Sequence, residues 1–299
     1  MDTSFRSLLI ELGISSDDSI VDYYPRVRDT DQVTVLKCKK SGVYFLSDNA
    51  FGAEERYKKV DEFEYWERDW NKHKANDGDE PKIFEDDRRR AKQFQSYIED
   101  SSWLDFGCGG GGALRLAHQS SKKAIGLEIQ PGPRAYLNQV GIECVESLGD
   151  VDDESLDVVT LFHVFEHLQN PIEVLGEIAQ KLVSGGTIII EVPQANDALL
   201  SLYDSNSFKE FTFWSEHLIL HTRSSLAKFI EQCDSLELES IQGFQRYPLA
   251  NHLYWLAKEM PGGHEKWAFL NNDPLQEAYA ETLQSLDMTD TLIAYIQKK

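Results

Sequence analysis

The stretch that decides the fold runs from Trp103 to Gly112 (WLDFGCGGGG) and leads directly into residues 113–117 (ALRLA). Apolar residues typical of a buried strand come first, glycines follow, and a helix-like segment begins at the last glycine. Glycine permits the tight turn that this order requires, and the free N–H groups at the start of a helix can bind ligand atoms. The pattern predicts a ligand-binding turn between a strand and a helix.

Two carboxylates near this turn indicate which cofactor it holds. Gly107, Gly109 and Gly112 satisfy the G-x-G-x-x-G spacing, so a dinucleotide is a competitor. Asp105 precedes Gly107 by two positions, where it would repel a pyrophosphate but suits the ammonium group of S-adenosylmethionine. Glu128 closes the next predicted strand, about 20 residues on, where an acid holds ribose hydroxyls in either cofactor. The sequence therefore favours S-adenosylmethionine over NAD.

Strand-like and helix-like segments alternate around the turn. Strands are predicted at residues 103–106, 124–129, 143–146, 156–164, 187–192, 236–244 and 290–297, with helices at 113–119, 134–140, 172–183 and 224–233. Such alternation is typical of βαβ units in a parallel sheet that helices cover on both faces. The predicted fold class is α/β, with a Rossmann-like sheet of seven strands. The last strand is predicted to pair with the strand that ends at Phe244.

This reading divides the chain into two parts. Residues 1–85 are predicted to form an N-terminal extension or small subdomain that could act as a lid, and residues 86–299 the cofactor-binding domain. Within that domain, residues 246–288 form an insertion on the substrate side. Aromatic residues at helical spacing in the first part are predicted to form a lid or core stripe over the cofactor pocket: Phe63, Tyr65, Trp66 and Trp70.

Three motifs resemble those of the class I S-adenosylmethionine-dependent methyltransferases over roughly residues 87–245. They are residues 104–111 (LDFGCGGG), 155–168 (SLDVVTLFHVFEHL) and 182–193 (LVSGGTIIIEVP). The resemblance implies that Asp105 acts on the amino group of the cofactor through a hydrogen bond or a water. It further implies that Gly107, Cys108 and Gly109 line the methionine end, that Glu128 binds the ribose, that Ile129, Ser147 and Leu148 contact the adenine, and that Phe162 and His163 meet the cofactor.

Further segments narrow the resemblance to methyltransferases of sugar-nucleotide and polysaccharide biosynthesis. These are residues 193–200 (PQANDALL), 213–218 (FWSEHL) and 222–226 (TRSSL), and residues 35–45 (VLKCKKSGVYF) are similar to the start of sugar C-methyltransferases. A zinc ribbon occupies this last region in those relatives, but here Cys38 stands alone and no structural zinc is expected. The implied acceptor is a sugar, sugar nucleotide or polysaccharide precursor. A small non-sugar hydroxyl or quinone-like acceptor, an NAD-linked oxidoreductase and a non-catalytic cofactor-binding module stay open.

Histidines and a glutamate supply candidates for removing a proton from an acceptor hydroxyl. His217 is the first choice of base, and Glu166 and His167 are further catalytic candidates. The donors of His163, Glu166 and His167 also suit a divalent ion, but no fourth ligand is identifiable and no metal site is predicted. In the insertion, Arg246 could bind a phosphate through two parallel hydrogen bonds. The other substrate-binding candidates are Asn251, His252 and Tyr254. The alternative is that these aromatic residues only pack the insertion.

The excess of acidic over basic side chains limits which classes of molecule can bind to the protein surface. The 299 residues carry 51 acidic and 30 basic side chains, a formal net charge of −21. Nucleic acids and anionic membranes bind proteins through cations, so both are excluded as bulk electrostatic partners, and a small-molecule or sugar-nucleotide substrate is expected. The four cysteines form no CxxC pair, and no signal peptide or long apolar run is recognisable, which favours a cytoplasmic protein. The oligomeric state stays open.

Overall fold

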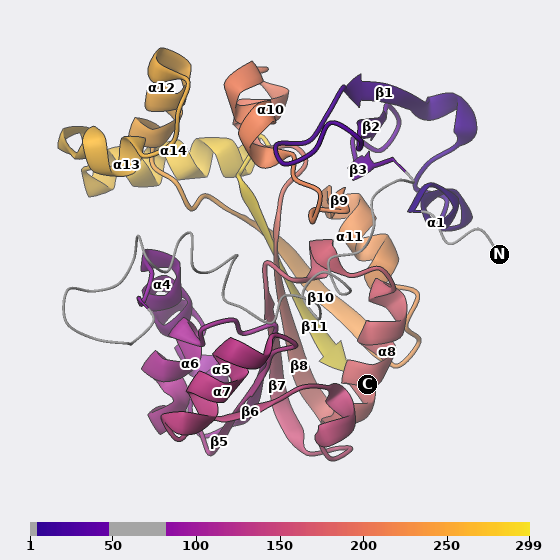
Figure 1. The fold of residues 1–299 in the computed structure, drawn as a ribbon, viewed down its shortest axis with the longest axis vertical. Helices are drawn as coiled ribbons and strands as arrows, with labels where there is room; N and C mark the ends of the chain where they lie inside the picture. The colour runs from indigo at the N-terminus through magenta and orange to yellow at the C-terminus, as the bar shows by residue number, and fades with distance from the viewer. Residues whose placement is uncertain (1–4, 48–81) are drawn as a thin grey trace.

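A sheet of seven strands forms the centre of the computed structural model, which describes residues 5–47 and 82–299 (Figure 1). In the order in which they lie side by side, its strands are β10 (Leu236–Phe244), β11 (Thr291–Lys298), β8 (Leu182–Pro193), β7 (Leu156–Phe162), β4 (Ser102–Phe106), β5 (Lys123–Leu127) and β6 (Glu143–Val145). The strands from β4 to β8 pair in parallel, whereas β11 runs antiparallel to β8 and β10. This confirms the predicted Rossmann-like sheet and the pairing of its last strand with β10.

Helices cover both faces of the sheet because its central strands are apolar on both sides. On one face lie α4 (Glu85–Gln93), α5 (Gln95–Ile98), α6 (Gly112–Ala117) and α7 (Pro131–Gln139), and on the other α8 (Pro171–Lys181) and α11 (Arg223–Ile230) (Figure 1). Phe94 and Leu114 pack against Trp103 in the first layer, and Leu175 and Phe229 occupy the second. Each such buried side chain contributes about 1.5–3 kcal/mol, so the two layers fix the strand ends that carry the site.

A second, smaller sheet joins the N-terminal residues to the rest of the chain. After α1 (Phe5–Glu11), its antiparallel strands β1 (Ile20–Tyr24), β2 (Val35–Cys38) and β3 (Tyr44–Leu46) are followed across the sheet by β9 (Ile219–Leu220). Because β9 comes from the part of the chain that follows β8, the N-terminal strands pair directly with the segment that carries His217. The four aromatic residues predicted to form a lid lie outside the described residues.

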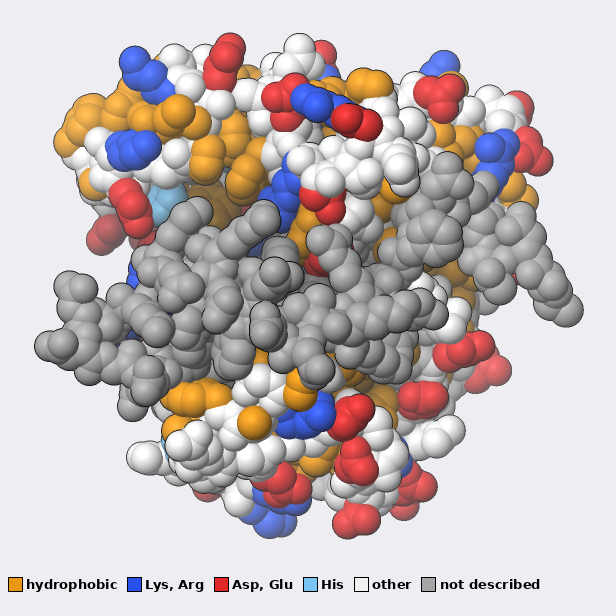
Figure 2. All heavy atoms as spheres, viewed as in Figure 1, with side chains coloured by type: hydrophobic (Ala, Val, Ile, Leu, Met, Phe, Trp, Pro, Cys, Tyr) orange, Lys and Arg blue, Asp and Glu red, His pale blue; other side chains and the backbone are white. Residues whose placement is uncertain are grey.

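The insertion between β10 and β11 is helical and stands beyond the carboxyl ends of the parallel strands (Figure 1). It contains α12 (Leu249–Lys258), α13 (Gly263–Lys266) and α14 (Asp273–Ser285), near the short helices α9 (Ala198–Ser201) and α10 (Asn206–Thr212). Hydrophobic side chains are visible over this part of the surface in Figure 2. Exposed large hydrophobic side chains of the insertion include Leu256, Met260 and Phe269. None of the helices in the described ranges has the length and apolar character needed to cross a bilayer.

Several strand boundaries differ from the predicted ones, and two of them have a cause in the backbone. The strand β8 begins at Leu182 rather than residue 187, because the chain continues as a strand through Gly185, whose φ is +80°. The strand β7 ends at Phe162 rather than residue 164, because His163 adopts a left-handed conformation with φ of 56° and turns the chain out of the sheet. Both differences lie at positions where backbone conformation, rather than apolar pattern, decides where a strand begins or ends.

Candidate cofactor and active site

The glycine turn has the predicted form. The strand β4 ends at Phe106, α6 begins at Gly112, and Gly107 between them has a φ of +70°. A Cβ atom at Gly107 would lie 2.6 Å from a methyl carbon of Val164, so both the backbone conformation and the space require glycine. The turn therefore brings backbone N–H groups close to whatever lies beyond the end of β4.

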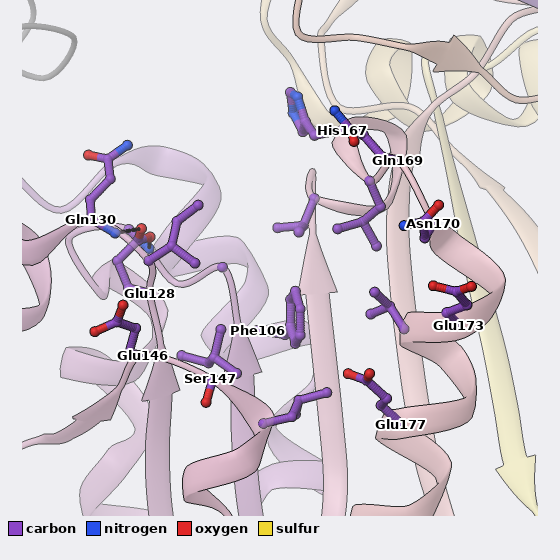
Figure 3. Close-up of a pocket in the computed structure, with 18 of the residues that line it drawn as sticks. Phe106, Glu128, Gln130, Glu146, Ser147, His167, Gln169, Asn170, Glu173 and Glu177 are labelled. Atoms are coloured by element: carbon purple, nitrogen blue, oxygen red, sulfur yellow. Dashed lines mark hydrogen bonds between the residues drawn. The ribbon is translucent and has the colours of Figure 1, made fainter. Parts of the chain in front are cut away.

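A cavity of about 500 Å³ opens beside this turn, between the ends of β5 and β7 and the helix α8 (Figure 3). The predicted cofactor residues that line it are Gly107, Gly109, Glu128, Ile129, Ser147, Leu148 and His163. The sequence did not single out Gln169, Asn170, Glu173 or Glu177, which complete the wall from the start of α8. Ligands of parallel α/β sheets bind beyond the carboxyl ends of the strands, and this cavity lies there.

The charge of the cavity distinguishes between the two candidate cofactors. Its described lining contains four glutamates and neither lysine nor arginine: Glu128, Glu146, Glu173 and Glu177. A wall of this kind attracts the positive sulfonium and ammonium groups of S-adenosylmethionine, whereas it would repel the pyrophosphate of a dinucleotide. The lining thus adds an independent argument to the one from Asp105.

Glu128 leaves the sheet immediately after β5 and is almost fully buried. Its Oε2 accepts the N–H of Gly109 at 2.9 Å and its Oε1 accepts the N–H of Gln130 at 2.8 Å. Burial raises the pKa of Glu128, and these backbone donors oppose that rise. Each oxygen retains acceptor capacity, so the carboxylate is suited to the paired hydroxyls of a ribose.

The other three predicted cofactor residues lie behind the cavity wall. Asp105 is buried, accepts a hydrogen bond from the hydroxyl of Thr160 at 2.7 Å, and burial raises its pKa to about 7. The thiol of Cys108 lies 4.0 Å from that of Cys144, and the ring of Phe162 packs against another aromatic ring within the core. Asp105 can still act on a cofactor through a water or the turn, and that role stays a prediction.

His163 is held at the cavity wall by two hydrogen bonds that define its tautomer. Nη1 of Arg246 lies 2.7 Å from His163 Nε2, and because arginine only donates, Nε2 is the acceptor. Nδ1 therefore carries the proton and donates to Oε1 of Glu166 at 3.2 Å. The backbone of His163 is strained at φ of 56°, and its side chain is held between the insertion and the end of β7.

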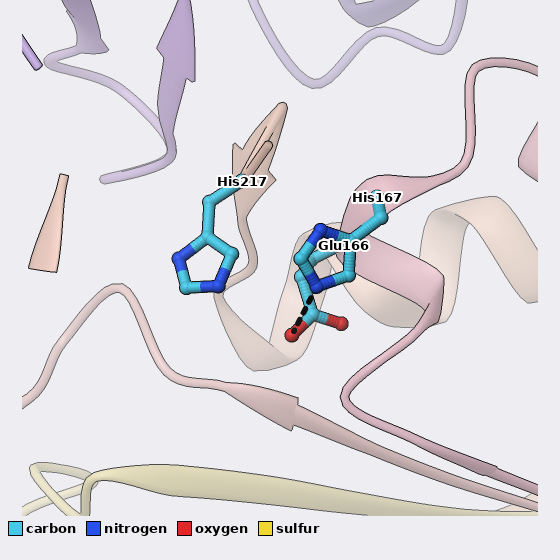
Figure 4. Close-up of side chains that lie close together, drawn as sticks. All are labelled: Glu166, His167 and His217. Carbon is cyan, nitrogen blue, oxygen red and sulfur yellow. Dashed lines mark ion pairs between the residues drawn. The ribbon is translucent and has the colours of Figure 1, made fainter. Parts of the chain in front are cut away.

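Glu166, His167 and His217 come together next to this wall, on a short 3-10 helix η4 (Phe165–His167) and on the segment before β9 (Figure 4). One donor atom of each lies within 4.8 Å of the others. Burial opposes ionisation of Glu166, but the imidazoles of His167 and His163 lower its pKa to about 2. Burial lowers the pKa of His217 to about 3, so its imidazole is neutral and a weak base. Of the three, His167 lines the cavity and His217 does not, so the geometry gives little support to His217 as the base.

Arg246 has partners that the sequence could not reveal. Its guanidinium forms a close ion pair with the carboxylate of Asp86 on α4 while it donates to His163. Burial opposes the charge, but Asp86 raises the pKa of Arg246 above its ordinary value. The guanidinium that was predicted to bind a phosphate is therefore engaged within the protein, and it positions His163.

The remaining substrate-binding candidates pack inside the helical insertion. Asn251 accepts the N–H of Gly263 at 3.2 Å, and Nδ1 of His252 lies 2.7 Å from the hydroxyl of Tyr279. These two side chains and Tyr254 are buried, and burial lowers the pKa of His252 to about 4. None of them lines the cavity as the described residues form it, so the geometry agrees with the packing alternative better than with substrate contact.

The basic run Arg88–Arg90 on α4 forms buried ion pairs with the sheet. Arg89 and Arg90 place their guanidinium groups 2.8 and 2.7 Å from Oε1 of Glu191, a fully buried carboxylate on β8. Burial opposes the charge of Glu191, but the guanidinium groups of Arg90 and Arg89 hold its pKa well below the ordinary value. The signal was present in the sequence, because an acid within the apolar strand TIIIEVP requires a buried partner.

A family model described as a methyltransferase domain matches residues 80–234, just over half of the chain. This chain belongs to that methyltransferase domain family. The cofactor of the domain is S-adenosyl-L-methionine, and the cavity beside the glycine turn is suited to it by position and by charge.

Two curated relatives match part of the methyltransferase domain. The mitochondrial Ubiquinone biosynthesis O-methyltransferase of Candida albicans is 34% identical over 124 residues, which cover 36% of this chain and 37% of that protein. The Ubiquinone biosynthesis O-methyltransferase of Hahella chejuensis is 25% identical over 103 residues, which cover 31% of this chain and 43% of that protein. The chain thus spans less than half of the length of each of these relatives.

Solved structures agree on the fold. A SAM dependent methyltransferase from Archaeoglobus fulgidus superposes with a TM-score of 0.52 at 18% identity, covering 79% of this chain and 99% of that one. A chain in the complex between a Haloferax volcanii methyltransferase activator and a methyltransferase superposes with a TM-score of 0.51 at 17% identity, covering 80% of this chain and 97% of that one. At these identities the likeness extends to the fold alone.

Proposed function

We propose that this protein transfers the methyl group of S-adenosylmethionine to a hydroxyl oxygen of a small, quinone-like acceptor. The observation that carries the proposal is the glutamate-lined cavity beside the glycine turn, in a chain of the methyltransferase domain family. Both curated relatives are named O-methyltransferases, which supports an oxygen nucleophile. Their names also support an acceptor related to ubiquinone, whose precursors carry ring hydroxyls.

In this proposal the chain's own residues hold the cofactor and order the acceptor. Glu128 binds the ribose hydroxyls, the N–H groups of the glycine turn contact the methionine end, and His163 borders the cavity in a fixed tautomer. The acceptor oxygen attacks the methyl carbon in line with the carbon–sulfur bond, and that bonding pair passes to sulfur as S-adenosylhomocysteine leaves. The acceptor hydroxyl must also lose its proton, and His167, the member of the cluster that lines the cavity, is the candidate for assisting that loss.

A sugar acceptor and a place in polysaccharide biosynthesis rest on weaker support. They depend on the resemblance of residues 193–200, 213–218 and 222–226 to sugar-nucleotide methyltransferases. An anionic sugar nucleotide would have to enter beside four glutamates, with the guanidinium of Arg246 already paired to Asp86. The cytoplasmic location likewise rests on the sequence argument alone.

Calorimetry and an acceptor panel test the proposal. We expect S-adenosylhomocysteine to bind and NAD not to bind, and Glu128→Ala to weaken cofactor binding at least tenfold, whereas the exposed Glu231→Ala leaves it unchanged. With labelled S-adenosylmethionine, ring hydroxyls of quinone precursors are expected to accept the methyl group and nucleotide sugars are not. Methyl transfer to sugars alone would replace the acceptor class, and cofactor binding with no transfer to any acceptor would favour a non-catalytic module.

A further inference from the structure

The cluster of Glu166, His167 and His217 contains donor atoms that the described protein leaves unsatisfied. Oε2 of Glu166 and Nδ1 of His217 are both buried without a hydrogen-bond partner. The side chain of Glu166 has no exposed surface. A buried carboxylate oxygen and a buried imidazole nitrogen without partners are each costly, so two members of this cluster are not satisfied by the described residues.

The backbone fixes how His167 faces this cluster. Nδ1 of His167 lies 2.7 Å from the carbonyl oxygen of Glu216, and because a carbonyl only accepts, Nδ1 carries the proton. In the neutral ring Nε2 is then a lone pair, and it lies 3.8 Å from Oε1 of Glu166. A lone pair and a carboxylate repel each other unless a cation, either a proton or a metal ion, lies between them. A carbonyl that orients an imidazole through its other nitrogen is also the usual outer partner of a metal-bound histidine.

We propose that Glu166, His167 and His217 bind a divalent metal ion of the zinc class. One carboxylate and two imidazoles are ligands that zinc accepts, and three protein ligands leave one position of a tetrahedron open. Donors at about 2.1 Å from zinc lie about 3.4 Å apart, so a set within 4.8 Å needs a contraction of at most about 1.4 Å. In the sequence, His163 stood beside Glu166 and His167 as a further donor of the right kind. Both ring nitrogens of His163 are hydrogen-bonded, one to Arg246 and one to Glu166, and His217 takes the third position instead.

The open position connects the ion with the cofactor cavity, because His167 belongs both to the cluster and to the cavity wall (Figures 3 and 4). This consequence rests on the proposed function. An acceptor hydroxyl bound to the ion would lose its proton to solvent more readily, and the resulting oxygen would attack the methyl carbon. His217 would then be a ligand whose neutrality is required for metal binding, rather than a base.

Metal titration tests the site without reference to activity. The full chain, freed of metal by dialysis against a chelator, is titrated with Zn²⁺ by calorimetry and with Co²⁺ by visible absorption. We expect one equivalent of either ion to bind, with ligand-field bands for Co²⁺ that indicate nitrogen and oxygen ligands. His217→Ala and His167→Ala are each expected to weaken the affinity by more than about tenfold, since even outer-sphere changes cost about 10–100-fold. His118→Ala, which removes a histidine from the end of α6, is expected to leave it unchanged.

Retained circular dichroism and retained binding of S-adenosylhomocysteine identify the variants that are folded. Failure of the wild-type chain to bind either ion stoichiometrically would overturn the proposal and leave an imidazolium of His167 paired with Glu166. Binding that both His217→Ala and His167→Ala leave unchanged would overturn it as well. Stoichiometric binding at this site together with absence of methyl transfer would retain the metal site and reject the proposed function, so the two can fail separately.

Discussion

At the scale of a single residue, Asp105 couples the glycine turn to pH. The carboxyl is buried beneath the turn, and burial raises its pKa to about 7, so it is partly protonated at neutral pH. The predicted interaction of Asp105 with the ammonium group of the cofactor would favour the ionised form, so binding would release a proton wherever the free carboxyl holds one. We expect the affinity for S-adenosylhomocysteine to fall as the pH falls below about 7, by at most tenfold per pH unit.

Calorimetry from about pH 8 to about pH 5.5, in buffers of different ionisation enthalpy, measures both the affinity and the proton released. Asp105→Asn keeps the hydrogen-bond partner of Thr160 and removes the titration, so its affinity should be lower at high pH and nearly independent of pH. An equally steep pH dependence in Asp105→Asn would assign the effect to another group. A flat profile in the wild-type chain would remove Asp105 from cofactor binding.

At the scale of elements, Glu191 joins the strand β8 to the helix α4. Its buried carboxylate receives Arg89 and Arg90, which are themselves mostly covered. Glu191→Gln removes the buried charge that both guanidinium groups share and leaves Arg89 with Asp86 as its remaining ion-pair partner. Removing one member of a buried ion pair costs about 3 kcal/mol of unfolding free energy. The exposed pair of Lys228 and Glu231 supplies the control, because Glu231→Gln should cost about 0.5 kcal/mol or less.

The difference in unfolding free energy between wild type and Glu191→Gln depends on pH because the pKa of Glu191 is lowered in the folded protein. The pKa of Glu191 is held well below its ordinary value, so its stabilisation is complete above the unfolded-state pKa of about 4.3 and is lost as the pH falls toward the folded-state value. Urea denaturation should therefore give a wide gap between wild type and Glu191→Gln at neutral pH, and a narrower one near about pH 3. A gap that widens in acid would contradict the assignment.

The same elements indicate what the sequence could and could not predict. The glycine turn and the strand order followed from local pattern, because Gly107 and the apolar runs act on their own neighbours. Partners distant in sequence did not follow: Glu191 meets Arg90 across 101 residues, and His167 meets the segment of His217 across about fifty. The sequence shows an acidic residue, Glu191, within an apolar strand, which indicates that it has a buried partner. Only the packing of α4 on the sheet shows which residues act as that partner.

At the scale of the whole molecule, the net charge of −21 and the four glutamates of the cavity act in the same direction on a cofactor. S-adenosylmethionine carries one more positive charge, on sulfur, than S-adenosylhomocysteine, so the field of the protein favours the substrate form of the cofactor over the product form. We therefore expect the acidic residues to weaken the binding of the spent cofactor relative to that of S-adenosylmethionine.

Salt separates this electrostatic contribution from the contacts that both forms share. Raising the ionic strength from about 0.05 M to about 0.5 M shortens the screening length several-fold, so the affinity for S-adenosylmethionine should fall severalfold while that for S-adenosylhomocysteine changes little. Replacing Glu173 and Glu177 on α8 with glutamine should reduce this difference, because both line the cavity, whereas Glu231→Gln on the surface should preserve it. Calorimetry at several salt concentrations measures how steeply the affinity for each of the two ligands depends on ionic strength. Equal slopes for the two forms would mean that the glutamates do not face the sulfonium, and the cofactor would then have to lie with its sulfur away from α8.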